Sequence, residues 1–317
     1  MTNSFFGLKR AGLAVVPPSA TQLAKGAAFV DRIEQVKALR AGEAAKAVAP
    51  TPETPAAKPE RFTDPKPLDP ANILSPSSLN QFIDCEARWF YRRVLELPET
   101  RGAALGLGTA VHEAVIENFR QKIETKRDLP TDGVTALFID AMNRQLDEIT
   151  LTKDESADEL KQCGEVMTRV YMDQVAPRVQ PAAVEMPVQG MIGDVAVRGF
   201  VDIMDVNGDI IDLKTASKKP SSISAGYRAQ VATYSMLAPG ASGRARLDTL
   251  TKTKTVSSHE QTIQIGEADR KFSTRLYSIA QEKMRTGLFA PNRSSHLCSR
   301  KYCSFADRCI ADYGGFV

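Results

Sequence analysis

The chain has 317 residues, of which 43% are hydrophobic and 25% are charged, and its formal net charge is +3. That composition can supply a substantial buried core, and the length suits one folded domain with an N-terminal extension. No apolar run approaches the roughly eighteen residues that cross a bilayer. We therefore expect no membrane contact and a cytoplasmic location.

Residues 1–70 differ in composition from residues 71–317. They hold ten Lys or Arg and seven Asp or Glu, and because the rest of the chain holds 31 of each, they account for the whole net charge. Residues 50–70 contain seven of the eighteen prolines, which predicts a linker. Apolar residues at helical spacing predict a short amphipathic helix over residues 21–43. This helix could dock on the folded domain, bind a partner protein or form only transiently.

The folded domain, residues 71–317, should alternate helices and strands. The pattern predicts an α/β fold with a central mixed β-sheet flanked by helices. The expected order is a helix over 77–96, helices over 106–123, 133–150 and 156–175, about three strands through 182–214, a helix over 225–238, strands through 244–264, and a helix over 267–286 before a cysteine-rich tail.

Basic residues in two of these elements are candidates for nucleic-acid contacts. Arg92 and Arg93 stand among aromatic residues in the first helix, as in a channel for a single strand, although such residues are also common on helix faces and in cores. Lys252 and Lys254, in a strand-like run, could contact phosphates. Because residues 71–317 carry no net charge, an anionic strand would need a local basic groove.

The most informative run covers residues 202–214 and reads DIMDVNGDIIDLK. Asn207-Gly208 predicts a two-residue hairpin turn between two strands. Folding back at that turn would bring the carboxylates of Asp202 and Asp212 side by side. Lys214 should point to the same face as Asp212, because side chains alternate along a strand.

Two carboxylates that can hold a hard divalent cation, with an ammonium beside them, suit the cleavage of phosphodiesters. The cation would polarise the scissile phosphate and lower the pKa of its water, while the lysine would stabilise charge on the attacking or leaving oxygen. The alternative is a hairpin that carries acids and a lysine on a solvated face.

Three of the five cysteines form a C-x4-C-x5-C cluster near the C-terminus, at Cys298, Cys303 and Cys309. Three clustered thiols need a fourth ligand for a tetrahedral zinc ion or an iron–sulfur cluster. Cys85 in the first helix is the candidate, and His296 could replace one thiol. Disulfides are not expected, because no secretory signal is visible.

The order of the motifs resembles the RecB-like branch of the PD-(D/E)XK nuclease superfamily, from about residue 75 to residue 309. The matching elements are a G-x-x-x-H motif that ends at residue 112, G-x-x-D at 199–202, D-x-K at 212–214 and Q-x-x-x-Y at 230–234. This resemblance implies a restriction-endonuclease-like core and a deoxyribonuclease that uses Mg²⁺ or Mn²⁺.

The resemblance also implies the metal ligands. One or two ions would lie among His112, Asp202, Asp212 and the backbone carbonyl of Leu213. Glu185, on the strand that enters the sheet, matches a glutamate that the family often places near the metal, although a solvated strand acid fits the sequence as well.

Gln230 and Tyr234 share one helical face because they are four residues apart. In this position they would contact DNA phosphates or orient the groups of the site. Together with His112, Glu185 and the Asp202, Asp212 and Lys214 set, they complete the predicted catalytic residues.

A distant N-terminal cysteine combined with a C-terminal triplet resembles the iron–sulfur clasp of AddB-type and CRISPR-associated RecB-like nucleases. The resemblance implies a structural [4Fe-4S] cluster at Cys85, Cys298, Cys303 and Cys309, with Zn²⁺ as the alternative. The first gap of the triplet is longer here than is usual in the family. Ligands this far apart in sequence would restrict the unfolded chain strongly.

Relatives with this clasp commonly act as exonucleases on ends of single-stranded DNA. We therefore expect a DNA exonuclease in recombination, in repair, or in the processing of phage or mobile-element DNA. The alternatives are a structure-selective endonuclease and a non-catalytic DNA-binding subunit that keeps the fold. The intact set of His112, Asp202, Asp212 and Lys214 argues against the last of these.

Overall fold

A computed structural model of the chain describes residues 74–252 and 255–316, all within one compact unit that extends over residues 59–317. The predicted helix at 21–43 and the linker at 50–70 lie outside the described residues, as does Lys254. None of the helices in the described part of the chain is long and apolar enough to cross a membrane.

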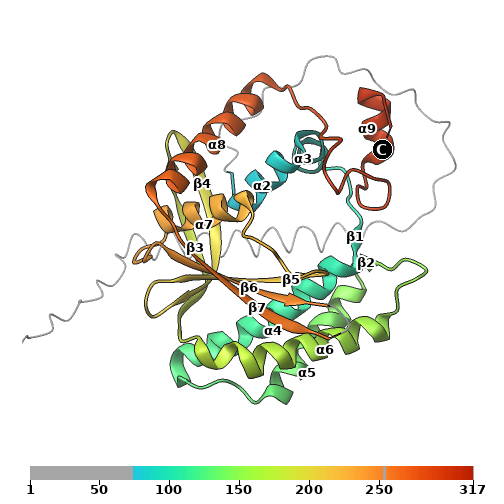
Figure 1. Cartoon of the computed structure of the whole chain (residues 1–317). Helices are drawn as coiled ribbons and strands as arrows, with labels where there is room; N and C mark the ends of the chain where they lie inside the picture. Colours follow the sequence, from blue (N-terminus) through green and yellow to red (C-terminus); the bar gives the residue numbers. More distant parts are fainter. Residues whose placement is uncertain (1–73, 253–254, 317) are drawn as a thin grey trace, which may run out of the picture. The chain divides into compact units, whose positions relative to one another are not determined.

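A five-stranded mixed sheet occupies the centre of this unit (Figure 1). The strands follow one another in sequence order, and only β5 and β6 pair in parallel. Helices flank the sheet, which confirms the predicted α/β architecture. The strands are β3 (Pro181–Ile192), β4 (Val195–Asp205), β5 (Ile210–Ala216), β6 (Arg244–Thr251) and β7 (Ser257–Gln264).

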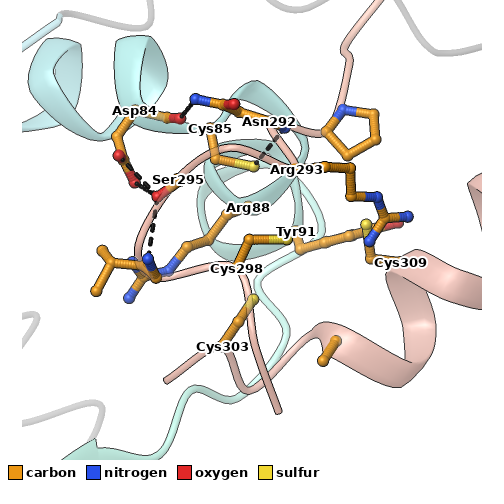
Figure 2. Close-up of a pocket in the computed structure, with 13 residues that line it drawn as sticks. Asp84, Cys85, Arg88, Tyr91, Asn292, Arg293, Ser295, Cys298, Cys303 and Cys309 are labelled. Carbon is orange, nitrogen blue, oxygen red and sulfur yellow. Dashed lines mark hydrogen bonds between the residues drawn. The ribbon is translucent and has the colours of Figure 1, made fainter. Parts of the chain in front are cut away.

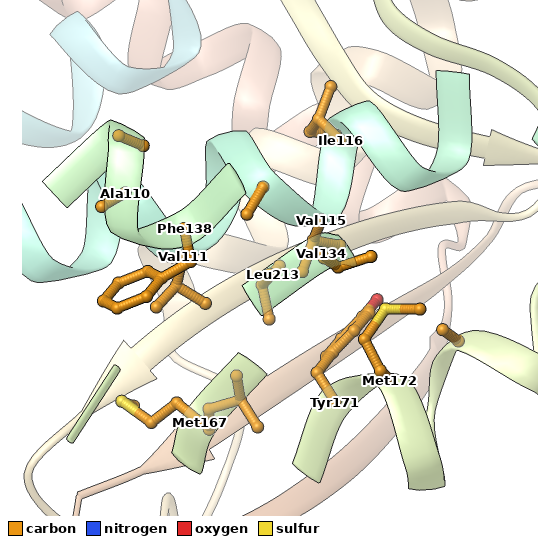
Figure 3. Packing of buried hydrophobic residues seen from close by; sticks show 14 of the residues in the cluster. Ala110, Val111, Val115, Ile116, Val134, Phe138, Met167, Tyr171, Met172 and Leu213 are labelled. Atoms are coloured by element: carbon orange, nitrogen blue, oxygen red, sulfur yellow. The ribbon is translucent and has the colours of Figure 1, made fainter. Parts of the chain in front are cut away.

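Three long helices pack together over the sheet: α4 (Ala103–Thr125), α5 (Thr131–Leu146) and α6 (Ala157–Gln174). Their apolar side chains form a core with Leu213 of β5 and residues of its neighbouring strands (Figure 3). Gly164 of α6 allows the close approach, because a Cβ there would lie 2.0 Å from the Phe138 ring of α5. This core fixes β5 and α4 relative to one another, and both carry predicted site residues.

The remaining helices build two further apolar clusters, one around α7 (Ala225–Leu237) and one around α2 (Pro76–Asp84). The cluster around α2 includes side chains from α3 (Glu86–Arg93), α8 (Glu267–Thr286) and α9 (Ala306–Tyr313). The sequence pattern did not predict α9, nor the short elements β1 (Arg101–Gly102), β2 (Ile149–Thr150) and η1 (Ala176–Arg178).

The predicted single helix over 77–96 is wrong, because the chain breaks it at Cys85. This residue has extended backbone angles, φ −158° and ψ 106°, between α2 and α3. The backbone N–H of Asn292 donates to Cys85 Sγ at 3.4 Å, and the Asn292 side chain donates to the Asp84 carbonyl at 2.8 Å. These contacts come from more than two hundred residues away, so a local helical pattern does not reveal the break.

The predicted two-residue turn at Asn207-Gly208 is one residue too short. Gly208 N–H donates to the Asp205 carbonyl at 3.0 Å, and Asp205 N–H donates to the Asp209 carbonyl at 3.0 Å. The loop therefore has three residues, with Gly208 left-handed at φ +81°. A type I turn followed by a left-handed glycine is the usual form of such a loop.

Candidate active site

The length of that loop sets the register that brings the two predicted aspartates together. Ile203 of β4 pairs with Ile211 of β5, and Asp202 and Asp212 occupy the next pair of positions. A two-residue turn would instead have opposed Asp212 to Ile203 and directed the two carboxylates to opposite faces. The extra loop residue is therefore a requirement of the site.

The backbone opposite Asp202 is irregular. Opposite Asp202 on β3, Glu185 has a left-handed backbone with φ +45°, which is uncommon for a residue with a side chain. Ile203 packs into the core beneath α4, whereas Val201, two residues earlier, packs into the cluster around α7. Asp202 thus lies between these two layers of helices.

His112 contacts the first aspartate from α4. Its Nε2 lies 3.3 Å from Asp202 Oδ2. Burial by itself would lower the pKa of His112, but the hydrogen bond and charge of Asp202 outweigh it and raise that pKa. Burial would likewise raise the pKa of Asp202, but the hydrogen bond and charge of His112 lower it. The two side chains thus lie within ion-pair distance, and each favours the charged form of the other.

Asp212 is the most deeply buried carboxylate of the site, with 2% of the residue exposed. The Lys214 ammonium lies 3.0 Å from its Oδ1 and 2.8 Å from its Oδ2. Only the Oδ1 contact has hydrogen-bond geometry, and Oδ2 has no hydrogen-bond partner among the described residues. Burial raises the pKa of Asp212 to about 7, assisted by the charge of Asp202 and opposed by Lys214.

Lys214 itself is half-exposed. Burial of its ammonium would lower its pKa, but the charges of Asp212 and Asp202 outweigh this effect and raise it. The lysine therefore stays protonated at neutral pH and provides a positive charge at the edge of the site.

Helix α7 places the two predicted residues of the Q-x-x-x-Y motif against the carboxylates. The Gln230 side-chain nitrogen donates to Asp212 Oδ1 at 3.3 Å. Tyr234 is buried, and burial together with the charges of Asp202 and Asp212 raises its pKa. Of the two roles that the sequence left open for Gln230, its contact in the structure is with the carboxylate.

Glu185 does not join the carboxylate pair. Its side chain is half-exposed and forms an ion pair with Arg120 of α4, at 2.6 Å between Nη2 and Oε2. It lies opposite Asp202 on β3, where its backbone is left-handed.

The donor set of the site suits a hard divalent cation. It offers carboxylate oxygens and an imidazole nitrogen, and the buried Asp212 Oδ2 has no hydrogen-bond donor. Among the residues described in the structure, no group of three or more His, Cys, Asp or Glu side chains is arranged to hold a metal ion. The side chains are paired with one another as ions instead, so a cation would have to replace the His112 and Lys214 contacts.

The other predicted DNA contacts lie apart from this pair. Arg92 Nε lies 3.0 Å from Glu99 Oε2, whereas Arg93 is exposed. Lys252 follows β6, and its backbone N–H donates to the carbonyl of Ala216 at the end of β5. The aromatic neighbours of the two arginines, Trp89 and Tyr91, are buried in the core, so they offer no stacking surface to a nucleic acid strand.

A second cluster of reactive groups lies between α2, α3 and α9 (Figure 2). The four predicted cysteines, Cys85, Cys298, Cys303 and Cys309, line one cavity as free thiols. The Ser295 hydroxyl bonds both carboxylate oxygens of Asp84, at 3.0 and 3.2 Å, and holds the C-terminal segment on the end of α2. The fifth cysteine, Cys163, lies elsewhere, against the core beneath α4.

Two guanidinium groups accompany the thiols in this cavity. Arg88 and Arg293 both line it, and Arg293 Nη1 is buried with no hydrogen-bond partner in the described part of the chain. Burial raises the pKa of Cys303, and the charge of Arg88 opposes that rise. Burial also raises the pKa of Cys309, where the charge of Arg293 opposes it. The cavity thus offers both thiol ligands and compensating positive charge.

Sequence reasoning did not identify two residues that touch the site. Asn80 of α2 contacts Gln230, and no motif marks it. Thr215 faces Gly108 of α4, where a Cβ would lie 2.8 Å from the Thr215 hydroxyl. Only the packing of α4 on β5 reveals that contact.

The raised pKa of Asp212 has a measurable effect on the metal-free protein. The folded state binds this proton more tightly than the unfolded chain, whose carboxyl pKa is about 3.9, so the free energy of unfolding falls as pH rises from about 4 to about 7. The Asp212→Asn variant lacks this proton. The free energy of unfolding of the variant minus that of wild type should therefore rise by on the order of 2 kcal/mol between about pH 5 and about pH 8.

Denaturant unfolding in a chelator at both pH values measures this difference. Asp194→Asn, in the exposed turn between β3 and β4, is the matched control and should show no such change. A stability difference for Asp212→Asn that stays constant with pH would contradict the buried, proton-binding carboxyl.

Comparisons with known proteins identify the family of the chain. No curated protein matches the chain. Among solved structures, it is similar to a "Putative exonuclease" from Eubacterium rectale, at 14% identity over 76% of this chain and 88% of that chain, with a TM-score of 0.49. It is also similar to SSO0001, at 14% identity over 73% of this chain and 96% of that chain, with a TM-score of 0.32. A model of the PD-(D/E)XK nuclease superfamily matches residues 73–310, a range that contains every described residue of the site, and the chain therefore belongs to that superfamily.

Proposed function

We propose that this protein is a metal-dependent DNA exonuclease of the RecB-like branch. The observation that carries the proposal is the juxtaposition of Asp202 and the buried Asp212 on adjacent strands, flanked by His112 and Lys214. Such a cluster of charges costs stability in a folded protein, and a divalent cation would offset that cost.

A Mg²⁺ or Mn²⁺ ion, when bound, would polarise the scissile phosphate and activate a water molecule. His112, Asp202, Asp212 and the carbonyl of Leu213 are the groups that would hold it. Lys214, freed from Asp212, would donate to a phosphate oxygen and stabilise the charge that develops there. Gln230 would keep the Asp212 carboxylate in one orientation through its hydrogen bond.

The choice of an exonuclease on single-stranded DNA ends rests on the RecB-like motifs and the cysteine clasp. Recombination, repair, and the processing of phage or mobile-element DNA all use such an activity. Arg93 and Lys252 are proposed phosphate contacts, and residues 1–70 could bind a partner protein. A structure-selective endonuclease could use the same side chains, so the substrate must be tested directly.

The test uses end-labelled linear and closed circular single-stranded DNA, with Mn²⁺ or Mg²⁺, and protein purified without oxygen. We expect metal-dependent loss of the linear DNA alone, and the position of the label gives the polarity. Because Asp212→Asn and Lys214→Ala remove a proposed ligand and a charge donor, each should lower the rate by about 100-fold or more.

The other outcomes separate the alternatives. Cleavage of the circle would replace the exonuclease with an endonuclease. Binding of DNA by a folded protein without any cleavage would overturn the catalytic proposal in favour of a binding subunit.

Gly108 should be required for activity because it lets α4 approach β5 closely enough for His112 to reach Asp202. In Gly108→Ala, the new Cβ would lie 2.8 Å from the Thr215 hydroxyl and shift the helix. We expect activity to fall about tenfold. Stability should hold or rise, because alanine favours a helix over glycine by about 0.5–1 kcal/mol.

The double variant Gly108→Ala with Thr215→Ala removes the atom that the new Cβ meets. It should recover most of the activity of the Thr215→Ala single variant. If the double variant is no more active than Gly108→Ala, the contact between α4 and β5 does not explain the need for this glycine.

For the thiol cavity, we propose a structural [4Fe-4S] cluster, with Zn²⁺ as the alternative. Four free thiols line the cavity, and four cysteine thiolates are the usual ligands of such a cluster. The buried, unpartnered Arg293 Nη1 suits an anionic group that would occupy the cavity. The cluster would tie the start of the nuclease domain to its end.

Analysis of iron, sulfide and zinc in protein purified without oxygen tests this proposal. We expect roughly four irons and four sulfides per chain. Cys303→Ser and Cys309→Ser should lose both, whereas Cys163→Ser, outside the cavity, should retain them. One zinc per chain would select the alternative, and a stable protein with neither metal would contradict a metal centre in this cavity.

A further inference from the structure

A chain of side-chain amides connects α2 to the buried catalytic aspartate. Asn80 Nδ2 donates to Gln230 Oε1 at 3.2 Å, and Gln230 Nε2 donates to Asp212 Oδ1 at 3.3 Å. The chain thus extends from the helix that ends at Cys85, through α7, to β5. The three residues are far apart in sequence, so only the fold brings them together.

The direction of this chain follows from the acceptor at its end. An ionised carboxylate can only accept hydrogen bonds, so Gln230 must present its NH₂ group to Asp212. Its carbonyl oxygen then faces α2 and needs a donor there. Asn80 supplies that donor, and an acceptor at position 80 would favour the opposite orientation of the Gln230 amide.

The surroundings fix the orientation of Asn80 in turn. Its Oδ1 lies against the first turn of α7, where a Cβ at Gly226 would be 3.2 Å away. That oxygen has no hydrogen-bond partner among the described residues. The positive end of the α7 dipole favours an oxygen in this place, which leaves the NH₂ group for Gln230. The carbonyl oxygen of the Asn80 amide is therefore buried without a hydrogen-bond donor, which costs stability. A residue that served only to stabilise the fold would not be expected to carry this cost.

We propose that Asn80 is a positioning residue of the nuclease site. It holds the Gln230 amide in the orientation that donates to Asp212 and so fixes the carboxylate that would bind the metal. The inference rests on the proposed function for its catalytic effect, whereas the orientation of Gln230 can be measured without any activity.

Two substitutions at position 80 separate positioning from packing. Asn80→Asp keeps the shape and the oxygen at the end of α7, but turns an acceptor toward Gln230 and should reverse the Gln230 amide. Asn80→Ala removes more contacts but leaves Gln230 free to donate to Asp212. If Asn80 positions Gln230, Asn80→Asp should lower kcat by roughly 10- to 100-fold relative to wild type. Asn80→Ala should lower kcat less than Asn80→Asp does. The KM for DNA should change less than kcat in Asn80→Asp.

The first readout is kinetic, with Mn²⁺, at a pH of about 8, where an aspartate at position 80 is ionised. Each substitution is also made in a Gln230→Ala background, where neither should have a further effect. If Asn80→Ala is as harmful as Asn80→Asp, or if either effect persists without Gln230, the positioning role is overturned in favour of packing.

The second readout is the side-chain NH₂ resonance of Gln230 in metal-free, nitrogen-15-labelled protein at a pH of about 8, above the pKa of Asp212. The resonance is assigned by its loss in Gln230→Ala. Asn80→Asp should shift this resonance strongly, and Asn80→Ala should shift it little. If wild type cleaves no DNA, the proposed function fails and this resonance alone decides the inference. An unchanged resonance in Asn80→Asp would overturn it.

Discussion

The repulsion between two neighbouring carboxylates is the constraint that the rest of the site depends on. Asp202 and Asp212 lie on adjacent strands, and Asp212 is almost fully buried. Each carboxylate has a counter-charge, since His112 pairs with Asp202 and Lys214 pairs with Asp212. A protein that needed only a stable sheet would place apolar residues at these positions. This cost in stability is the reason for the cation site that we propose.

The scaffold meets this constraint with rigid elements from three directions. The three-residue loop at 206–208 sets the register, the close approach at Gly108 brings in α4, and α7 adds Gln230 behind the aspartates. Helix α2 contacts both candidate sites. Asn80 meets the amide of Gln230, and Cys85, at the end of the same helix, lines the thiol cavity. A single helix of nine residues thus contacts both the thiol cavity and the side chains around the candidate carboxylates.

The sequence predicts the order of the main helices and strands because their apolar periodicity is strong. It also predicts that Asp212 and Lys214 share a face, because alternation along β5 is a local feature. The register that pairs Asp202 with Asp212, however, depends on a loop one residue longer than the predicted turn. The break at Cys85 depends on Asn292, which is distant in sequence. The loop that ends at Gly208 has one more residue than the Asn-Gly signal indicates, and the left-handed backbone of Glu185 has no sequence signature. Asn80 belongs to no motif that names a function, so only its contact reveals it.

The central claim is that the two aspartates and His112 form a divalent-cation site. Anomalous diffraction from crystals of the protein soaked in Mn²⁺ tests it most directly, with the Asp212→Asn variant soaked in parallel. The account predicts a manganese peak between Asp202 and Asp212, within reach of His112, that is weak or missing in the variant. A fully soaked wild-type crystal with no peak at the two aspartates, or with manganese bound only elsewhere, would contradict it.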